Sequence, residues 1–409
     1  MELMHARCAG LDVHKDTVVA CVRVAEEGRK TFRTTRTFGT FTSNLEELRA
    51  WLEEQQITHV AMEATGVYWV PVWHMLEQAF ELILANPAHI KNVPGRKTDV
   101  RDAEWIAELL AHGLVTASFV PPAIIQDLRH LTRDRVQFER EKTRHVQRIQ
   151  KTLQDANLKI DSVITDIMGL SGRAFLDAIV AGETDPERLA DLGHRRLHAS
   201  RNDLVEALRG IVTDHHRHAI KRHLGMVSSI EAAVTDIDEE VAALLEPFRA
   251  QVERLITMPG ISEVSARVII AEIGLDMERF RTAAHLVSWA GLSPRCDESA
   301  GKQRSTRIGR GGQWLKTTLV QAAWSAARTK DSHFKALFMR LKARRGAKKA
   351  IIAVAAEMLR SAWHMLSRLE NYKDPGARPL DEQARQRAAA KLVHKLKKLG
   401  YEVTFPQAA

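Results

Sequence analysis

The chain has 409 residues, a length that predicts two or three domains rather than one. Hydrophobic residues make up 45% of it, which is normal for globular protein and argues against extensive disorder. Charge is uneven: residues 301–409 hold 24 Lys and Arg against 7 Asp and Glu, whereas the first 300 residues are net acidic. A basic C-terminal block favours a polyanionic partner, the plainer alternative being a soluble protein with a lysine-rich tail.

Cysteine usage and hydropathy narrow the setting. The chain has only Cys8, Cys21 and Cys296, with no CxxC pair, so we expect reduced thiols and no zinc site. No leader-like pattern opens the chain, and its best apolar stretch, residues 351–369, contains three charged side chains. The sequence therefore predicts a cytoplasmic protein with no membrane partner.

The first 126 residues alternate strand and helix signals. Apolar and β-branched runs predict strands at 8–13, 17–24, near 31–37, 59–63 and 80–85, and helical periodicity predicts helices at 44–55 and 70–79. The first three strands follow one another as a meander, with a turn at 14–16, and the later ones alternate with helices. This order indicates a mixed sheet with helices on both faces.

Strand signals vanish in the middle of the chain. Residues 126–158 and 228–255 each predict a long helix with a thin apolar stripe, and residues 161–225 predict shorter helices with breaks. Two such helices are typical of an antiparallel coiled-coil arm, whose stripe would be covered by a second subunit or by RNA. A simple structural spacer is the alternative.

Residues 256–370 predict a compact helical unit, interrupted by a glycine-rich basic loop at 301–312. The tail ends in a basic helix, 388–399, and a short strand, 401–405. We therefore expect an α/β domain followed by all-α parts. The predicted division is 1–126, 127–254, 255–371 and a basic tail, 372–409.

Four acids of the first domain suggest a metal site. Asp12 interrupts an apolar strand, Glu63 ends another, and Asp99 and Asp102 stand three apart where a helix begins. Buried carboxylates gathered together are costly without a cation, and oxygen ligands suit Mg²⁺ or Mn²⁺. Taken singly, Asp102 could instead cap a helix and Asp12 could close the hairpin turn.

Two features of the helical unit suggest phosphate contacts. The Pro259-Gly260 turn followed by a helix resembles a helix-hairpin-helix element, although Ser262 stands where a second glycine is usual, and a plain helix-turn-helix packing unit is the alternative. Further on, a helix is predicted from Gln313 after a run of glycines and cations, an arrangement that favours anion binding. The cations of this loop that we expect to touch nucleic acid are Lys302, Arg304, Arg307 and Arg310.

Ser299 lies in a polar stretch that we expect to be flexible, and no histidine base is adjacent. It is either a turn residue or a nucleophile that depends on nearby cations and metal-bound phosphate. The basic helix over residues 127–151 is a candidate for RNA contact, through Arg133, Arg140 and Arg144.

Taken together, these residues resemble the IS110 family of transposases over about residues 8–370. The motifs that carry the resemblance are Gly-Leu-Asp12-Val-His-Lys, Met-Glu63-Ala-Thr-Gly-Val-Tyr-Trp, Lys-Thr-Asp99-Val-Arg-Asp102-Ala, Met-Pro259-Gly260-Ile, and Trp-Ala-Gly-Leu followed by Glu-Ser299-Ala-Gly-Lys.

The resemblance implies a RuvC-like domain of RNase H fold, a coiled-coil arm and a helical transposase domain. Its DEDD acids would be Asp12, Glu63, Asp99 and Asp102, holding Mg²⁺ or Mn²⁺, with Ser299 as nucleophile supplied by another subunit. It implies a prokaryotic, nucleoid-associated recombinase, which cleaves and rejoins donor and target DNA through a phosphoserine–DNA link. A noncoding bridge RNA would guide it, and the protein would act as a dimer or, in the synaptic complex, a tetramer.

Two rival functions stay open on the sequence. One is a hydrolytic endonuclease of the RuvC or RNase H type acting on DNA junctions or hybrids, for which the acids are essential and Ser299 is dispensable. The other is a non-catalytic DNA- or RNA-binding module. The presence of all four acids and the serine argues against that second reading.

Overall fold

The structure is a computed structural model of the chain. It describes residues 3–26, 28, 30–64, 66–85, 102–294, 297–299, 302–305, 307–309, 311–376, 390, 392–394 and 396–400, with 297–299 and 302–305 described at the level of the backbone. The chain divides into two compact units, Met1–Pro121 and Pro122–Ala409, each of which is described by itself.

The first unit is built on a five-stranded mixed sheet, in the order β3-β2-β1-β4-β5. The strands are β1 (Arg7–Val13), β2 (Thr17–Val24), β3 (Phe32–Gly39), β4 (His59–Glu63) and β5 (Glu81–Ala85). The first three pair antiparallel as a meander, whereas β4 runs parallel to both β1 and β5. The predicted mixed sheet is therefore confirmed.

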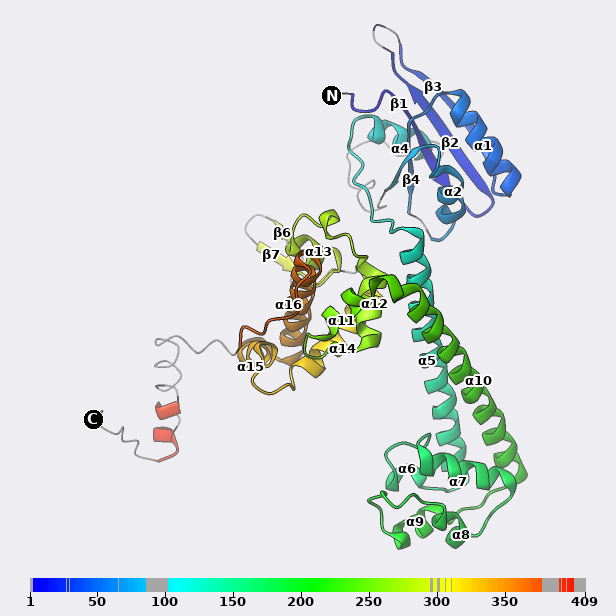
Figure 1. The fold of residues 1–409 in the computed structure, drawn as a ribbon, viewed down its shortest axis with the longest axis vertical. Helices are drawn as coiled ribbons and strands as arrows, with labels where there is room; N and C mark the ends of the chain where they lie inside the picture. The colour runs from blue at the N-terminus through cyan, green and yellow to red at the C-terminus, as the bar shows by residue number, and fades with distance from the viewer. Residues whose placement is uncertain are drawn as a thin grey trace. The chain divides into compact units, whose positions relative to one another are not determined.

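Helices cover both faces of this sheet (Figure 1). Helices α1 (Thr42–Glu54) and α2 (Trp69–Leu76) bury their apolar faces against one side, where the odd-numbered β1 residues Leu11 and Val13 point. Helix α4 (Asp102–Ala111) packs on the other side, against Cys8 of β1 and Ala61 of β4. Alternate residues of a strand face opposite sides of its sheet, which is why both faces of β1 are apolar.

In the second unit, α5 (Ala123–Asp155) and α10 (Asp214–Leu245) pack side by side as a two-helix arm. Contacts along the pair join Arg135 to Asp238, His145 to His223 and Asp155 to His216, so the helices run antiparallel. Between them, four short helices close the end of the arm around their own apolar core: α6 (Ile160–Val163), α7 (Leu170–Ala181), α8 (Pro186–Asp191) and α9 (Arg201–Leu208).

The predicted helix at 228–255 was wrong in both bounds. Helix α10 already begins at Asp214, because the Thr213 side chain accepts from the backbone N–H of His216 and the His216 ring receives the N–H of Thr213 in return. It ends at Leu245, where a 3₁₀ turn (Glu246–Phe248) contains Pro247, a residue with no N–H to continue the ladder. The next helix, α11 (Arg249–Ile256), is separate.

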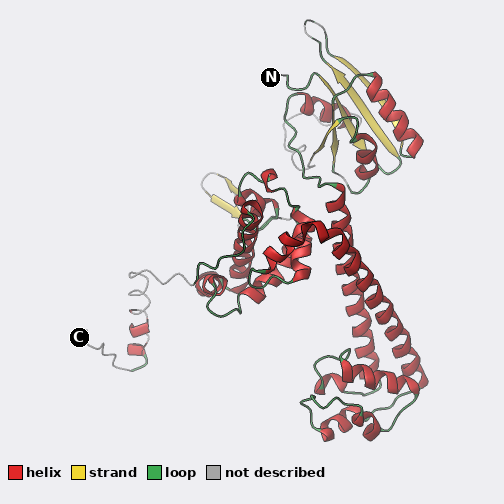
Figure 2. Ribbon diagram, in the orientation of Figure 1, coloured by secondary structure: helices red, strands yellow, loops and turns green. Residues whose placement is uncertain are grey.

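The remaining helices form a single apolar core: α12 (Glu263–Ile273), α13 (Ala283–Trp289), α14 (Gln313–Ala326), α15 (His333–Arg345) and α16 (Ala347–Arg368), with α11 and a 3₁₀ turn, Met277–Arg279. Ile125 and Leu128 of α5 belong to the same core, so the base of the arm is part of this helical unit. A two-stranded hairpin, β6 (Asp297–Ser299) and β7 (Lys302–Ser305), interrupts the helices (Figure 2). The glycine-rich loop predicted at 301–312 therefore contains a strand, β7, and the predicted flexibility of the stretch around Ser299 stays a prediction.

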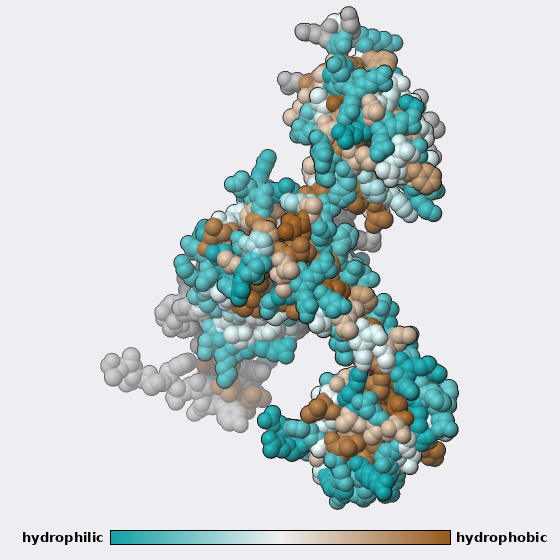
Figure 3. Space-filling model, turned by 45° about the vertical axis from the view of Figure 1, so that its right-hand side comes forward, coloured by the Kyte–Doolittle hydropathy of each residue, from teal (hydrophilic) through white to brown (hydrophobic). Residues whose placement is uncertain are grey.

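The visible face of the molecule is mostly hydrophilic, with apolar side chains exposed in scattered groups (Figure 3). Among the described residues, no helix is long and apolar enough to cross a membrane. In the tail, the described parts of 390–398 are helical, in line with the predicted basic helix, and the predicted strand at 401–405 lies outside the described residues.

The arm should lose stability as the pH falls, through His223. Burial, together with the neighbouring His145 and the cations Arg148 and Arg222, lowers the pKa of His223 below its ordinary value. A group with a lowered folded-state pKa favours unfolding once the unfolded chain takes up its proton, so this contribution is present above about pH 6.5 and is lost below it. Thermal melts from pH 7.5 to 5.5 should therefore show a smaller decline for His223→Gln than for wild type. Equal declines would contradict the assignment.

Candidate functional site

Asp12 and Glu63 end neighbouring parallel strands. The pairing of β1 with β4 runs from Cys8 opposite His59 to Leu11 opposite Met62, and the next residue on each strand is the acid, Asp12 or Glu63. The carboxyl ends of parallel strands lie at the same edge of a sheet. Asp12 therefore reaches the edge at which Glu63 closes β4, and about a fifth of its side chain is exposed there.

Gly10 is the point at which helix α4 packs directly on β1. A Cβ built on Gly10 would lie 2.3 Å from Ala103 O and 2.4 Å from Ala107 N, so the backbone of α4 rests directly on β1 at this point. The Cys8 thiol, one pleat earlier, reaches Ala107 O at 3.6 Å. Following β1 towards its carboxyl end thus means following α4 towards its N-terminus.

Asp102 is brought to the same edge by this packing. It is the first residue of α4, and both Asp12 and Glu63 continue the face of the sheet that carries Gly10 and Ala61, against which α4 lies. Strand pairing thus places Asp12 and Glu63 at one edge of the sheet, and Asp102 begins the helix that packs on the same face. Asp99 lies outside the described residues.

The alternative role of Asp12, in the turn after β1, can be compared with the structure. The turn after β1 is closed by the backbone bond from His14 N–H to Thr17 O, and Asp12 lies within β1, paired with Val19. Asp12 takes no part in that backbone bond. Its carboxylate instead lies 3.1 Å from His14 Nε2, a partner that sequence reading treated only as a turn residue although it is the second residue after the acid.

As they stand, the described side chains do not form a closed metal cage. Among the residues that the structure describes, no group of three or more His, Cys, Asp or Glu side chains is placed to hold one ion. The acids at the sheet edge still present oxygen donors at a surface that a helix N-terminus adjoins. Carboxylate oxygens are ligands that suit a hard divalent cation.

The two described cysteines play no part in this edge chemistry. Cys8 and Cys21 are both buried and unbridged, as expected, and burial raises the pKa of the Cys8 thiol to about 11. Burial also raises the pKa of Cys21. Both stay protonated at neutral pH and are poor nucleophiles and metal ligands. Cys296 lies outside the described residues.

Ser299 lies at the end of β6, where its backbone pairs with that of Lys302. The hairpin is held at its base by a bridge between Pro294 and Ile308. Strand pairing thus places the backbone of Lys302 beside that of Ser299, and Arg304 follows two positions after Lys302 on β7. The side chains of Ser299, Lys302 and Arg304, and all of Arg310, lie outside what is described, and Arg307 is exposed.

The glycines after this hairpin serve internal packing. A Cβ on Gly291 would lie 2.9 Å from Gly311 N, and one on Gly311 would lie 2.5 Å from Trp289 O. Lys316 of α14 donates to Gly309 O at 2.7 Å, and burial lowers the pKa of this lysine. The end of α13 and the start of α14 can therefore approach closely only without side chains. The proposed approach of these glycines to a phosphate stays a prediction.

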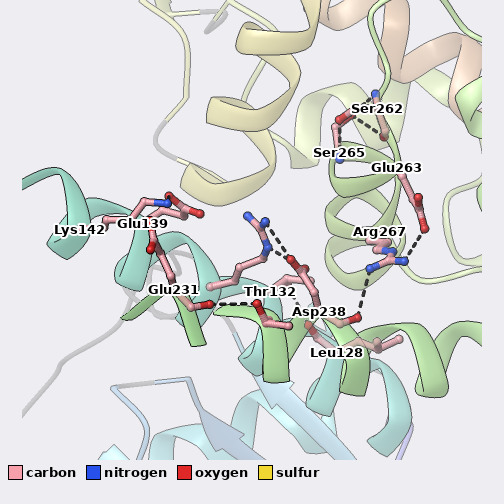
Figure 4. Close-up of polar contacts among 12 residues, drawn as sticks. Leu128, Thr132, Glu139, Lys142, Glu231, Asp238, Ser262, Glu263, Ser265 and Arg267 are labelled. Atoms are coloured by element: carbon pink, nitrogen blue, oxygen red, sulfur yellow. Dashed lines mark hydrogen bonds and ion pairs between the residues drawn. The ribbon is translucent and has the colours of Figure 1, made fainter. Parts of the chain in front are cut away.

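The Pro259-Gly260 turn also packs against a helix. Gly260 has φ +85°, and a Cβ there would meet Ala322 O at 2.4 Å, so the turn is seated on α14. Ser262 caps α12 through a reciprocal pair with Ser265, visible in Figure 4, which explains a serine where a second glycine was expected. These contacts favour the packing role of the element.

The three arginines predicted on α5 have different environments. Arg133 makes two hydrogen bonds, of 2.8 and 3.0 Å, to the carboxylate of buried Glu272 on α12. Arg140 is exposed, and its guanidinium lies 5.2 Å from the ring centre of Trp314 on α14. Arg144 is exposed further along the arm. Arg133 is thus part of the fold, a role that sequence reading missed because its partner is 139 residues away.

A groove of about 570 Å³ lies between α5, α12 and α14. Its lining includes Arg133, Arg140, Trp314, Thr317 and Gln321. Arginine, an indole, hydroxyls and an amide are groups that contact nucleic acid, so Arg140 keeps the role that sequence analysis gave it as a prediction.

Comparisons with known proteins match both halves of the chain. Residues 9–158 match a family profile described as "Transposase", and residues 252–339 match one described as "Transposase IS116/IS110/IS902 family". The chain is 27% identical over 324 residues to the "Probable family 20 transposase" of Pseudomonas aeruginosa, covering 78% of this chain and 86% of that protein. It is 24% identical over 376 residues to the "Transposase for insertion sequence element IS1111A" of Coxiella burnetii, covering 89% and 90%.

Gly10→Ala should dislodge α4 from the sheet. The added methyl would overlap backbone atoms that have no room to move, so we expect roughly 3 kcal/mol of destabilisation. Gly225→Ala is the control, because a Cβ at that position of α10 meets nothing within 4 Å and should stabilise the helix by up to about 1 kcal/mol. Denaturant unfolding measures both, and an unperturbed Gly10→Ala variant would contradict the close approach.

Arg133→Gln and Arg140→Gln should differ in their effect on the free energy of unfolding. The first leaves the buried Glu272 carboxylate without its bidentate partner, with an expected cost of about 3 kcal/mol. The second removes an exposed guanidinium from Trp314 and should change stability by less than about 1 kcal/mol. The measurement is the free energy of unfolding of each variant. Equal effects would show that Arg133 is not a structural residue.

Proposed function

The chain belongs to the IS110 family of transposases, and from this membership and the placement of its acids we propose that it is a recombinase that cleaves and rejoins donor and target DNA. The observation that carries it is that strand pairing places Asp12 beside Glu63 at one edge of a mixed sheet, on the face against which the helix beginning at Asp102 packs. All four predicted acids fall within residues 9–158, and Ser299 falls within residues 252–339, the two matched regions.

The topology of the first unit supports a RuvC-like assignment. A three-strand meander continued by two parallel strands, with helices on both faces, is the arrangement expected of an RNase H-type sheet. In this reading the acidic edge is the nuclease site. We propose the same division for the rest of the chain as the sequence predicts, with residues 127–254 as a coiled-coil arm and 255–371 as the transposase domain.

Mg²⁺ or Mn²⁺ fits the donor set of the acidic edge. Asp12, Glu63 and Asp102 offer only carboxylate oxygens there, and the two described cysteines are buried with raised pKa values. When bound, such a cation would polarise a phosphate and neutralise its charge. The chain's own contribution is positional: strand pairing fixes Asp12 beside Glu63, and α4 delivers Asp102.

Ser299 is the proposed nucleophile of the second unit. Its Oγ would attack the phosphorus of the scissile phosphodiester, forming one P–O bond while the bond to a deoxyribose oxygen breaks and that oxygen takes up a proton. A hydroxyl of the other DNA strand would reverse the step, so the bond energy is conserved and no ATP is consumed. Lys302, its partner across the hairpin, is of the right charge to hold the phosphate.

We further propose that a noncoding bridge RNA guides the reaction and that the active form is a homo-oligomer, in which Ser299 acts beside the acids of another subunit. Exposed cations of α5 such as Arg144 suit contact with RNA, and the arm suits subunit pairing. Base pairing would then read sequence while the protein reads backbone and shape.

The alternative is a RuvC-like endonuclease that hydrolyses DNA junctions. The same acidic edge supports it, because that edge alone suffices for metal-dependent hydrolysis. It differs from the proposed recombinase in one observable, since hydrolysis leaves no covalent link between protein and DNA.

Covalent trapping tests the proposal. Wild-type protein, Mg²⁺, RNA from the flanking element and labelled donor and target DNA should yield a protein–DNA adduct on a denaturing gel. Ser299→Ala should abolish the adduct, since the nucleophilic oxygen is removed, and Asp12→Asn should reduce it by at least about a hundredfold. Ser305→Ala, at the far end of the same hairpin, is the matched control and should leave the adduct intact.

The outcomes separate the candidates. An adduct that needs both Ser299 and Asp12 supports the recombinase. Cleavage without an adduct, unchanged in Ser299→Ala but lost in Asp12→Asn, would establish the hydrolytic nuclease instead. Omitting the RNA tests guidance independently, because an adduct of equal yield without RNA would contradict that part.

A further inference from the structure

A cationic hairpin of two helices stands apart from every residue discussed so far. Helices α15 and α16 pack against each other and meet at Gly346. Residues 333–349 contain seven Lys and Arg and no Asp or Glu, and we call this segment the basic hairpin. Six of its cations are exposed: Arg340, Lys342, Arg344, Arg345, Lys348 and Lys349.

These charges are not consumed inside the fold. Throughout the described part of the chain, no ion pair involves a cation of the basic hairpin, whereas Arg133, Arg135 and Arg267 each contact an acid. Lys342 makes a cation–π contact instead, with its Nζ 5.8 Å from the ring centre of Phe338. Neighbouring like charges with no counter-charge repel one another, so the cluster keeps a strong positive potential.

The dipole of α16 opposes two of these six exposed cations. Arg344 and Arg345 close α15 at its C-terminus, where the helix dipole favours cations. Lys348 and Lys349 lie in the first turn of α16, where the dipole disfavours them, and that turn has neither an acidic residue nor a side-chain cap. A sequence selected for stability alone would place an acid there. The unfavourable lysines therefore point to a bound anion.

The Phe side chains of the basic hairpin point into the core. Phe334 and Phe338 are its only aromatic residues and both are buried, with Tyr372 stacked on Phe334 at 5.4 Å. On the other helix, Ala350, Ile351 and Val354 are buried in the core. Unpaired bases are bound on exposed aromatic side chains, and the segment 333–349 exposes no Phe, Tyr or Trp of its own. Its clustered cations suit the regular phosphates of a duplex.

We propose that the basic hairpin binds the phosphodiester backbone of duplex DNA, independently of base sequence. The inference rests on the proposed function in one respect, namely that the protein handles DNA; it does not depend on cleavage, on Ser299 or on the RNA. The hairpin holds the duplex by charge alone, so affinity must fall steeply with salt.

The test is equilibrium binding of the full chain to a labelled DNA duplex of arbitrary sequence across a salt series. Lys348→Gln/Lys349→Gln should weaken binding on the order of tenfold at 0.1 M salt and reduce the salt slope by about 1 to 2. Arg49→Gln/Arg249→Gln removes the same charge from exposed residues paired with acids, and should leave the slope unchanged. The first variant should melt at or above the wild-type temperature, because the helix dipole no longer opposes two cations.

Either of two results would overturn the proposal: an unchanged affinity and slope for duplex DNA in Lys348→Gln/Lys349→Gln, or a loss confined to RNA. The failure of the proposed function is distinguishable, because wild type could bind duplex with the predicted salt dependence and yet form no adduct. Conversely, a normal adduct yield with unaltered duplex binding in the variant would leave the recombinase standing and remove the basic hairpin.

Discussion

The acidic edge depends on one close approach, that of the α4 backbone to β1 at Gly10. Helices normally rest on a sheet at side-chain distance, but here the strand has no Cβ and the facing helix residues, Ala103 and Ala107, are small. The helix therefore lies close enough for its first residue, Asp102, to reach the edge where Asp12 and Glu63 emerge. Its N-terminal dipole adds positive potential beside those carboxylates.

A buried carboxylate plays a comparable role in the second unit. The Glu272 side chain on α12 is 2% exposed and accepts hydrogen bonds from Nε and Nη2 of Arg133. Arg129 donates to the backbone carbonyl of the same residue. These contacts join the arm to the helical core across a polar helix that has too few apolar residues to do so alone. Arg135 and Asp238 continue the connection between the two arm helices. Part of the positive charge of α5 is thus structural, whereas Arg140 and Arg144 of the same helix are exposed.

Several glycines in this chain allow close backbone packing, although their sequence pattern would also suit a phosphate-binding loop. Gly260, Gly291 and Gly311 each allow one backbone to touch another, and the glycine-rich segment before α14 is folded onto the end of α13. The same residues would suit a phosphate-binding loop. The distances identify their neighbour in the folded chain as protein backbone. The basic hairpin differs, because Lys348 and Lys349 occupy the first turn of α16, where an acidic residue would be more stabilising.

The sequence by itself determined the sheet, its two helical faces, the strands at 17–24 and 59–63 and the start of α14, because alternation and helical periodicity are local. It also singled out the acids by their settings, and strand pairing places two of them, Asp12 and Glu63, side by side. Their role as metal ligands stays a prediction. The bounds of α10 were missed although Thr213 and Pro247 mark them locally. Only the tertiary structure decided the short polar strands β6 and β7 and the role of Arg133. These depend on partners distant in the chain, or on strands too polar and short to show a pattern, so no local signal carries them.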